Sequence, residues 1–467
     1  MLNLRKYMSK QTKVIVAKFG GTSMSNAESI RRVAEIISWD KPAITVVSAT
    51  SGTTNILEKL NDDAPNQTWN KTSKVIDELH SKHIKIANDL GCGKDTEEKL
   101  ALLFEEARTL AHGMQMLKES PKAASDRLMS LGERTSSLLL ACYLQEQVSS
   151  KIKLLDARTI ITTNNDHGQA QPAYEVIAIN AQKELIPKIG KGASYVTQGY
   201  IGRGHDGNTT TLGRGGSDFS AAIFAEAISA DELQIWTDVS GISSTDPRIV
   251  SVATPLTELT YGEAAELASA GAKILFPPTV IPTKRSNIPI RILNTFDPDN
   301  PGTYIRDEIK DKPLIRAIAS KRNQHLLTLS SPLMSEEYGF MSRIFNAFAL
   351  HKINIDLITT SETSVALTLG DEIINHRQLF DDLRAIVDVK LEKDMCVVSI
   401  VGNRMNETPG VATHIFGALG DSSDAINVRM ICQGAYRHSM ALVIDDKHSN
   451  SAIKALHKNL IEKRFYS

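Results

Sequence analysis

The sequence predicts an α/β protein with a parallel sheet, followed by a region built on a duplicated unit. A short apolar strand, a loop of small residues and a helix follow one another twice, at residues 14–37 and from residue 43 onward. This order is typical of parallel sheets, whose ligands bind at the carboxyl ends of the strands. After residue 313 a β-α-β-β plan occurs twice, with Gly339 matched by Gly410 and Asn354 by Asn427, which indicates an internal duplication.

Length and composition narrow the class of protein. The chain has 467 residues, of which 42% are hydrophobic and 23% charged, and its formal net charge is −1. Such a length predicts roughly two to four domains. The near-neutral charge argues against nucleic acid as the main partner. We expect no membrane partner, because neither a signal peptide nor a run of about 18 apolar residues is present. Four widely spaced cysteines indicate reduced thiols and a cytoplasmic location.

The first strand leads into a glycine turn. Residues 14–23 read Val-Ile-Val-Ala-Lys-Phe-Gly-Gly-Thr-Ser, and a helix is expected next, with Ser25 at its N-cap and Glu28 completing a capping box. Glycine amides, a helix N-terminus and Lys18 together suit an anion. A tight turn with a surface lysine explains the stretch equally well. The spacing of a Walker loop is absent.

A second apolar strand, at residues 43–49, ends in a hydroxyl-rich loop before the next helix. Residues 55–119 are expected to be helical and polar, with little chemistry. Residues 125–144 predict one helix that is interrupted at 132–134. Glu133 in this interruption is either an exposed helix charge paired with a neighbour, which is the usual case, or a carboxylate aimed at a substrate ammonium.

A second glycine-rich turn, at residues 209–218, precedes an apolar helix at 219–230. Arg214 lies between glycines, so the backbone can approach a ligand while the guanidinium grips a carboxylate or phosphate. Asp218 falls in the first turn of the helix, where a carboxylate suits the helix dipole. Helix capping explains Ser217 and Asp218 but not Arg214.

The strand at residues 232–238 ends in Thr237 and Asp238, and Asp246 and Arg248 follow closely. Two aspartates and an arginine at a strand end indicate a nucleotide-phosphate or metal neighbourhood, although an Asx-turn also explains Asp246. The stretch 297–313 predicts a hairpin and a boundary. Further strands are expected at residues 153–157, 194–202, 288–296, 326–330 and 397–402, and further helices begin after Gly339 and Gly410.

On these motifs the chain resembles the aspartokinases, most closely the monofunctional, lysine-sensitive branch, from residue 14 to the C-terminus. The combination of kinase motifs with a duplicated C-terminal unit is specific. The resemblance implies an amino-acid-kinase three-layer α/β/α sandwich at residues 12–305, then two intertwined α+β ACT domains at 314–392 and 393–467. The motifs that carry the resemblance are residues 18–23, 132–133, 213–218, 236–238, 245–248, 272–273 and 356–362.

The resemblance implies an ATP-dependent kinase that phosphorylates the side-chain carboxylate of L-aspartate to 4-phospho-L-aspartate, the first step of lysine, threonine and methionine biosynthesis. A carboxylate is already a nucleophile, so positioning and charge neutralisation matter most. Mg²⁺ would be held by the phosphates, and no protein metal site is expected. Two alternatives stay open: a catalytically silent ACT-type amino-acid sensor, and a kinase for another carboxylate such as glutamate.

The resemblance also assigns residues to catalysis and to the two substrates. Two lysines would neutralise the phosphates and an aspartate would orient them: Lys18, Lys273 and Asp218. Arg214 would hold the α-carboxylate of aspartate and Glu133 its ammonium, with hydroxyl groups supplied by Ser48, Thr54 and Ser217. The residues assigned to ATP are Lys18, Gly20, Gly21, Thr237, Asp238, Ser243, Arg248, Lys273 and Ile274. Ser240 and Ser243 replace a proline and a tyrosine that are frequent in the family, so stacking or packing there is lost.

An amino-acid effector, L-lysine by resemblance, would bind the first ACT unit. Glu337 replaces a small hydroxyl residue of related chains. An ACT core role is the alternative for Phe340 and Met341. ACT edges commonly pair across subunits, so a homodimer or a larger assembly is expected. The residues assigned to the effector are Met334, Gly339, Phe340, Met341, Asp356, Ser361 and Glu362.

Overall fold

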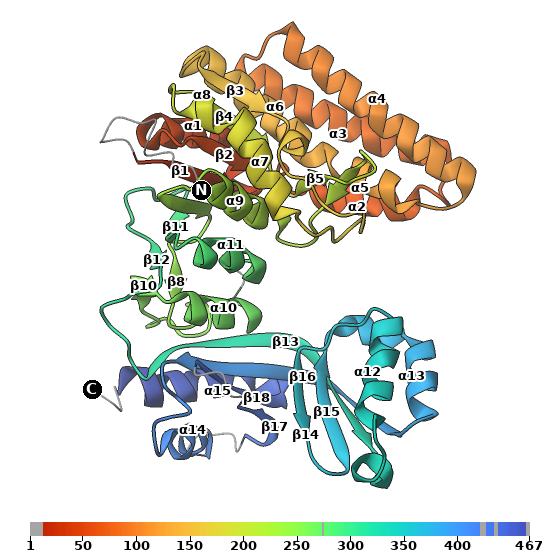
Figure 1. Cartoon of the computed structure of the whole chain (residues 1–467), viewed down its shortest axis with the longest axis vertical. Coiled ribbons are helices and arrows are strands. Elements are labelled where there is room, and N and C mark those ends of the chain that lie inside the picture. The colour runs from red at the N-terminus through yellow and green to blue at the C-terminus, as the bar shows by residue number, and fades with distance from the viewer. Residues whose placement is uncertain (1–12, 273–274, 421–425, 434–437, 464–467) are drawn as a thin grey trace. The chain divides into compact units, whose positions relative to one another are not determined.

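The computed structural model describes residues 13–272, 275–420, 426–433 and 438–463. These residues divide into two compact units, each with a main sheet of its own (Figure 1). The first unit comprises residues up to 242, 257–261 and 275–308. The second comprises 243–256, 262–272 and the described residues from 309 onward. The domain bounds expected from the sequence stay predictions.

Among the described residues, the first unit is organised on an eight-stranded sheet of order β10-β12-β11-β7-β1-β2-β4-β3. β1 (Ile15–Phe19) lies between β7 (Glu232–Thr237) and β2 (Ile44–Val47) and is parallel to both. β4 (Ser194–Gln198) is parallel to β2. The carboxyl ends of these four strands therefore meet at one edge, which is where a parallel sheet binds its ligands.

Helices cover both faces of this sheet. α1 (Ala27–Asp40) and α6 (Leu131–Gln147) share a core with Phe19 on one face. α9 (Gly216–Ala227) packs against β1, β2 and β7. Side chains alternate along a strand, so Lys18 faces away from the core that holds Phe19. The arrangement is the predicted three-layer α/β/α sandwich (Figure 1).

The other elements of the first unit connect these layers. The hairpin of β11 and β12 confirms the one predicted near residue 297. The helix predicted at residues 125–144 is two helices that meet at Ser130, so the interruption lies there and not at 132–134. The remaining bounds are α2 (Thr53–Asp63), α3 (Trp69–Leu90), α4 (Lys94–Leu117), α5 (Lys122–Met129), α7 (Tyr174–Glu184), α8 (Ile186–Ile189), α11 (Val280–Arg285), β3 (Ile152–Leu155), β5 (Ile201–Arg203), β6 (Thr209–Thr211), β10 (Glu258–Leu259), β11 (Ile290–Asn294) and β12 (Thr303–Ile305).

The second unit is organised on a six-stranded sheet of order β14-β15-β13-β16-β18-β17 among the described residues. Two long antiparallel strands, β13 (Ile315–Ser330) and β16 (Asp388–Gly402), run through both halves of it. Gly339 and Gly410 take left-handed φ values of 75° and 84° just before their helices, as equivalent positions of a duplication should. The remaining bounds are α12 (Phe340–Leu350), α13 (Arg377–Arg384), α14 (Val411–Gly420), α15 (Ser449–Leu456), β14 (Leu357–Thr360), β15 (Ser364–Leu369), β17 (Val428–Cys432) and β18 (Ser439–Asp445).

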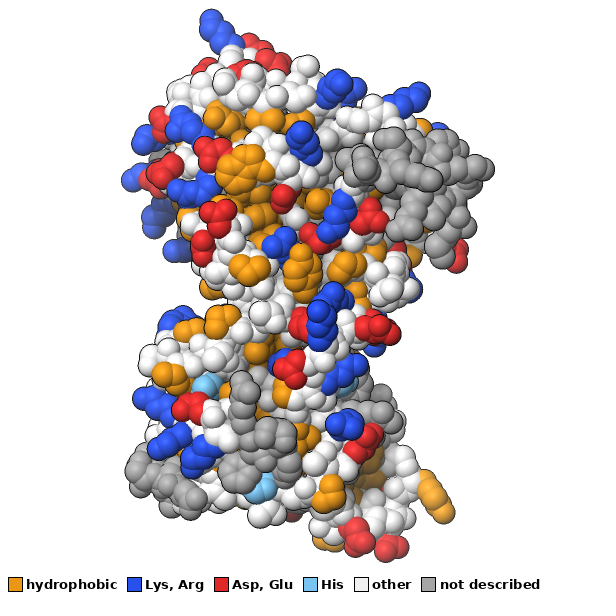
Figure 2. Space-filling view, turned by 90° about the vertical axis from the view of Figure 1, so that its left-hand side faces the viewer, with side chains coloured by type: hydrophobic (Ala, Val, Ile, Leu, Met, Phe, Trp, Pro, Cys, Tyr) orange, Lys and Arg blue, Asp and Glu red, His pale blue; other side chains and the backbone are white. Residues whose placement is uncertain are grey.

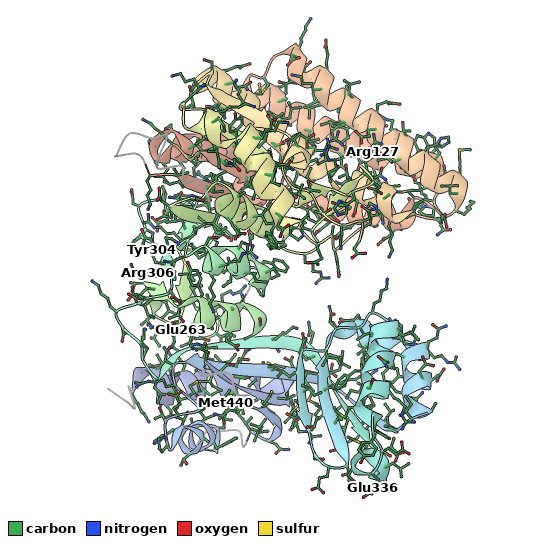
Figure 3. The ribbon with its side chains drawn as sticks, in the orientation of Figure 1. Arg127, Glu263, Tyr304, Arg306, Glu336 and Met440 are labelled. Atoms are coloured by element: carbon green, nitrogen blue, oxygen red, sulfur yellow. The ribbon has the colours of Figure 1, made fainter. Side chains whose placement is uncertain are left out.

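Two segments from the middle of the chain belong to this second unit through buried polar contacts. Glu263 of α10 (Tyr261–Ser269), labelled in Figure 3, accepts hydrogen bonds from Arg316 Nε at 3.1 Å and Asn403 Nδ2 at 2.7 Å. The Ser244 hydroxyl lies 2.9 Å from His457 Nε2. Segment 243–256 begins and ends in two short strands, β8 (Ile242–Ser243) and β9 (Pro255–Leu256).

The surface is mixed in charge. Basic and acidic side chains are interspersed over the face shown in Figure 2, in keeping with the net charge of −1. None of the helices formed by the described residues combines the length and apolarity that a bilayer span requires.

Candidate active site

Lys18 and Asp218 meet at the carboxyl edge of the parallel sheet. Lys18 Nζ lies 2.6 Å from Asp218 Oδ1, and both side chains are largely buried. Asp218 lies in the first turn of α9, as predicted, but this helix begins at Gly216 rather than at residue 219. It begins earlier because Gly215 takes a left-handed φ of 63° and serves as the N-cap. The fold thus unites two of the three residues assigned to catalysis.

The Gly20-Gly21 turn brings backbone next to the lysine ammonium. Gly20 N–H donates to Trp236 O of β7 at 3.1 Å. A Cβ atom on Gly20 would lie 3.6 Å from Lys18 Nζ, and one on Gly21 would lie 3.2 Å from Ala49 O. The turn therefore runs between β7 and the loop after β2, with a cation beside it, which suits an anionic group.

The helix after this turn is capped one residue later than predicted. Ser25 keeps a helical φ, ψ pair because a short 3₁₀ turn (Thr22–Met24) precedes it, so it cannot act as the N-cap. Asn26 is extended, and its Oδ1 accepts a hydrogen bond from Ser29 N–H at 2.9 Å. Asparagine caps a helix as well as serine does. The first helical N-terminus after the glycines is consequently that of the 3₁₀ turn.

The loop after β2 is held against α6. Ser48 N–H donates to Phe19 O at 3.1 Å, and Ser48 O accepts from the Ser136 hydroxyl at 2.6 Å. A Cβ atom on Gly132 would lie 2.7 Å from Ala49 Cβ, so only glycine lets α6 approach the loop this closely. The glycine of the Gly-Glu motif thereby brings the neighbouring carboxyl group to the loop after β2. Thr54 lies half-buried in the first turn of α2.

Glu133 is buried, with 4% of its surface exposed. Burial raises the pKa of Glu133 to about 8, although the backbone N–H groups of Ala49 and Glu133 and the charge of Lys18 act in the opposite direction. The usual interpretation, an exposed helix charge paired with a neighbour, is wrong for this residue. Arg134 instead pairs with Glu106 of α4 at 3.0 Å. Glu133 is therefore a buried carboxyl group whose ionised form an incoming ammonium would stabilise.

Glycines crowd the turn that carries Arg214. Gly213 and Gly215 flank it with φ values of 77° and 63°, a conformation that other residues rarely adopt. A Cβ atom on Gly199 would lie 2.6 Å from Ser217 Cβ, so this glycine makes room for the assigned serine. Arg214 itself is exposed.

Asp126 of α5 anchors the same turn, and no sequence pattern indicated it. Its buried carboxylate accepts hydrogen bonds from His167 Nδ1 at 2.8 Å, Gly168 N–H at 3.1 Å, Thr211 N–H at 3.1 Å and the Thr211 hydroxyl at 2.6 Å. Thr211 ends β6, just before Gly213. The partners lie 41 to 85 residues from Asp126, which is why no local pattern reveals them.

At the end of β7, the Thr237 hydroxyl donates to Asp238 Oδ1 at 3.1 Å. The following segment belongs to the second unit and contains an Asx-turn, in which Arg248 N–H donates to Asp246 Oδ1 at 2.9 Å. The Arg248 guanidinium also pairs with Asp246, and its side chain is 88% exposed. The Asx-turn interpretation of Asp246 is thus confirmed. Ser243 lies half-buried at the start of this segment.

Lys273 and Ile274 lie outside the described residues. Their assignment to the phosphates and the nucleotide stays a prediction from the resemblance.

The residues assigned to an effector lie in the first half of the second unit. Asp356 pairs with Lys321, with Nζ and Oδ2 2.5 Å apart. The Ser361 hydroxyl lies 2.7 Å from that of Ser364, and Glu362 is exposed. Gly339 is the N-cap of α12.

The apolar members of this set are partly core residues. Phe340 is buried in the core of this half, and Met334 and Met341 pack against the core from its edge. Phe340 therefore has the ACT core role that was its alternative. Glu337 pairs with Arg343, next to Glu336, which Figure 3 labels.

Comparisons with known proteins agree with this architecture. Residues 13–294 match the amino acid kinase family, and residues 327–375 and 398–460 match an ACT domain. The chain is 38% identical to lysine-sensitive aspartokinase 3 of Escherichia coli over 461 residues, which cover 97% of this chain and 100% of that protein. It is 34% identical to the chloroplastic aspartokinase 3 of Arabidopsis thaliana, with 96% and 81% covered.

Two solved structures of E. coli aspartokinase III are similar over their whole length. The complex with aspartate and ADP, described as the R-state, has a TM-score of 0.86 at 36% identity and covers 96% of this chain and 100% of its own. The complex with lysine and aspartate, described as the T-state, has a TM-score of 0.80 at 36% identity, with 96% and 99% covered. With the site at the edge of the sheet and the duplicated C-terminal unit, these similarities show that the chain belongs to the aspartokinase family.

Proposed function

We propose that this chain transfers the γ-phosphoryl group of ATP to the side-chain carboxylate of L-aspartate. One arrangement carries the proposal: the Lys18–Asp218 pair lies at the sheet edge that also holds the Ser48 loop beside the buried Glu133. The solved complex of the E. coli relative with aspartate and ADP supports the same pair of ligands.

In the proposed reaction, a carboxylate oxygen of aspartate attacks the γ-phosphorus. The bond from this phosphorus to the oxygen that bridges it to ADP breaks, and ADP leaves with that electron pair. The attacking oxygen carries no proton, so no general base is needed. The main barrier is the approach of two anions, which Lys18 lowers by neutralising charge while Asp218 holds its ammonium in place. By resemblance, Lys273 supplies a second positive charge.

Aspartate would be held by its α-carboxylate and by its α-ammonium group. Arg214 suits the α-carboxylate because a guanidinium binds a carboxylate through two parallel hydrogen bonds. Glu133 suits the ammonium, because the positive charge would offset the free-energy cost of ionising a buried carboxyl group. Hydroxyl groups of Ser48, Thr54 and Ser217 would complete this subsite.

ATP would enter as its magnesium complex. The described residues contain no cluster of three or more His, Cys, Asp or Glu side chains that could hold a metal. A magnesium ion held mainly by substrate phosphates needs only one or two protein carboxylates. The residues proposed for the nucleotide are Lys18, Gly20, Gly21, Thr237, Asp238, Ser243, Arg248, Lys273 and Ile274.

We also propose L-lysine as an effector of the first ACT half, with Asp356 receiving its ammonium. The E. coli relative was solved with lysine bound, which supports this choice. We propose a homodimer or a larger assembly because ACT domains commonly pair across subunits. A measurement of the molecular mass of the protein in solution tests this proposal.

The activity is tested by ADP release with Mg-ATP and L-aspartate, with L-glutamate as the control substrate. Lys18→Met should abolish turnover because it removes the cation at the phosphates. Lys13→Met is the matched control, since Lys13 precedes the same strand, pairs with Glu232 at 2.6 Å and has a half-exposed side chain. Turnover with glutamate alone would indicate a different carboxylate, and a folded protein without turnover would favour the sensor.

A further inference from the structure

A chain of hydrogen bonds links α3 to the loop after β2. Lys82 Nζ lies 2.8 Å from Ser51 O and 3.1 Å from Thr53 Oγ1. Thr53 Oγ1 lies 2.7 Å from Thr50 Oγ1, which lies 3.2 Å from His83 Nε2. The other nitrogen of the ring, His83 Nδ1, lies 2.7 Å from the backbone oxygen of Leu79. Lys82 and His83, which are neighbours on α3, thus form hydrogen bonds to the short loop between β2 and α2.

Chemistry fixes the direction of every bond in this chain. A backbone oxygen only accepts, so His83 Nδ1 carries the proton and Nε2 of the neutral ring must accept. The Thr50 hydroxyl therefore donates to His83 and cannot also donate to Thr53. The Thr53 hydroxyl consequently donates to Thr50, and the Lys82 ammonium, which has no acceptor capacity, donates to Thr53 and to the loop backbone.

His83 is suited to a permanent accepting role. Its side chain is fully buried and packs against Phe104, with 5.4 Å between ring centroids. Burial lowers the pKa of His83 to about 4, so the ring stays neutral at physiological pH. The buried Thr50 hydroxyl and His83 Nε2 satisfy one another, which makes the contact costly to break.

The loop that this hydrogen-bond network holds lies between predicted aspartate-binding residues. Ser48 precedes it and Thr54 follows the last tethered hydroxyl directly. The backbone N–H of Ala49, adjacent to Thr50, favours the ionised form of Glu133. Gly52, at the tip of the loop, has a left-handed φ of 77° and nothing within 4 Å of its Cβ position, so the loop is open to solvent at this residue.

We propose that Lys82, Thr53, Thr50 and His83 position the Ser48–Thr54 loop for binding of the amino-acid acceptor. They act through the loop and are positioning residues rather than catalytic ones. The inference rests on the proposed function, because it assigns a role to residues behind the proposed aspartate site.

The test is steady-state kinetics of the full chain with each substrate varied in turn. Thr50→Val keeps the shape of the side chain and removes the hydroxyl at the centre of the hydrogen-bond network. The KM for aspartate should therefore rise about tenfold, which corresponds to 1.4 kcal/mol. The KM for ATP should change less than about twofold, within the scatter of unrelated contacts. His83→Leu should behave like Thr50→Val. His83→Gln should restore most of the aspartate affinity, because the glutamine amide offers both an acceptor and a donor.

Thr72→Val is the matched control. Thr72 is buried on the same helix, and its hydroxyl has no hydrogen-bond partner among the residues that the structure describes. Its kinetic constants should stay at wild-type values. Equal increases in both KM values of Thr50→Val, or an unchanged KM for aspartate, would overturn the proposal, since either result fits a purely structural role.

Lys82→Met decides the matter if the buried variants do not fold. Lys82 is only half-buried, so its removal leaves no interior void. The variant loses both hydrogen bonds from Lys82 to the loop, and a KM for aspartate raised about threefold or more supports the proposal. An unchanged KM overturns it. A wild-type chain without aspartate turnover would contradict the proposed function itself, which separates the two failures.

Discussion

A comparison of the wild type with Glu133→Gln should reveal how the buried Glu133 makes the stability of the folded chain depend on pH. The pKa of this group is about 8 in the folded chain against an ordinary value of 4.5. At 1.36 kcal/mol for each pH unit, ionising it in the folded state costs about 5 kcal/mol more than in the unfolded chain. Between pH 4.5 and 8 the unfolded chain has lost this proton and the folded chain has kept it, so stability falls as pH rises.

Glu133→Gln removes this loss because glutamine does not titrate. The variant and the wild type should unfold at similar urea concentrations near pH 4.5. Near pH 8 the variant should be more stable by up to about 5 kcal/mol, read from urea denaturation at both pH values. A matched control is Glu146→Gln, an exposed glutamate of the same helix. Parallel stability curves for the wild type and Glu133→Gln would refute the raised pKa.

The same carboxyl group should make aspartate binding depend on pH. An ammonium ligand needs the ionised form, so the dissociation constant of aspartate should fall about tenfold for each pH unit gained below pH 8. Calorimetry in buffers of different ionisation enthalpy should detect a proton released on binding. Binding to Glu133→Gln should be weak and free of this pH dependence. A wild-type affinity that does not change from pH 6 to 8 would contradict the assignment of Glu133 to the ammonium.

Three further substitutions test other parts of the structure. Gly215→Ala should destabilise the chain by about 1–3 kcal/mol in thermal unfolding, because φ is positive and the new Cβ would lie 2.2 Å from Phe276 Cγ; a wild-type Tm would contradict this. Asp126→Ala should cost at least about 3 kcal/mol in urea denaturation, since four hydrogen bonds, two of them buried and two partly buried, are lost; a cost below about 1 kcal/mol would show that Asp126 is no anchor. Asp356→Ala should keep turnover and lose inhibition by lysine, and unchanged inhibition would remove Asp356 from the effector site.

Much of the architecture could be predicted because its signals are local. Apolar strands and glycine turns predicted the parallel sheet with Lys18 at a strand end and Asp218 in the first turn of a helix, and the duplication set Gly339 against Gly410. Errors of one to three residues arose at helix ends, where neighbouring residues compete. Asn26 caps the first helix in place of Ser25, and α9 starts at Gly216 because a left-handed glycine precedes it.

The contacts that position the site could not be predicted, since they join distant parts of the chain. The burial of Glu133 depends on how closely α6 approaches the loop after β2, which Gly132 permits. Asp126 looks like any polar residue of a helix until its partners are seen. His83 lies in a stretch that the sequence marks only as helical and polar, and its role depends on a loop 33 residues away.

Trapping of the product shows whether the side-chain carboxylate of aspartate receives the phosphoryl group. Phosphorylation of a carboxylate gives an acyl phosphate, which hydroxylamine converts into a hydroxamate. With Mg-ATP, L-aspartate and hydroxylamine, the chain should form the side-chain hydroxamate of aspartate in an amount equal to the ADP released. Release of ADP without this hydroxamate, or formation of the hydroxamate at the α-carboxylate, would contradict the proposed reaction.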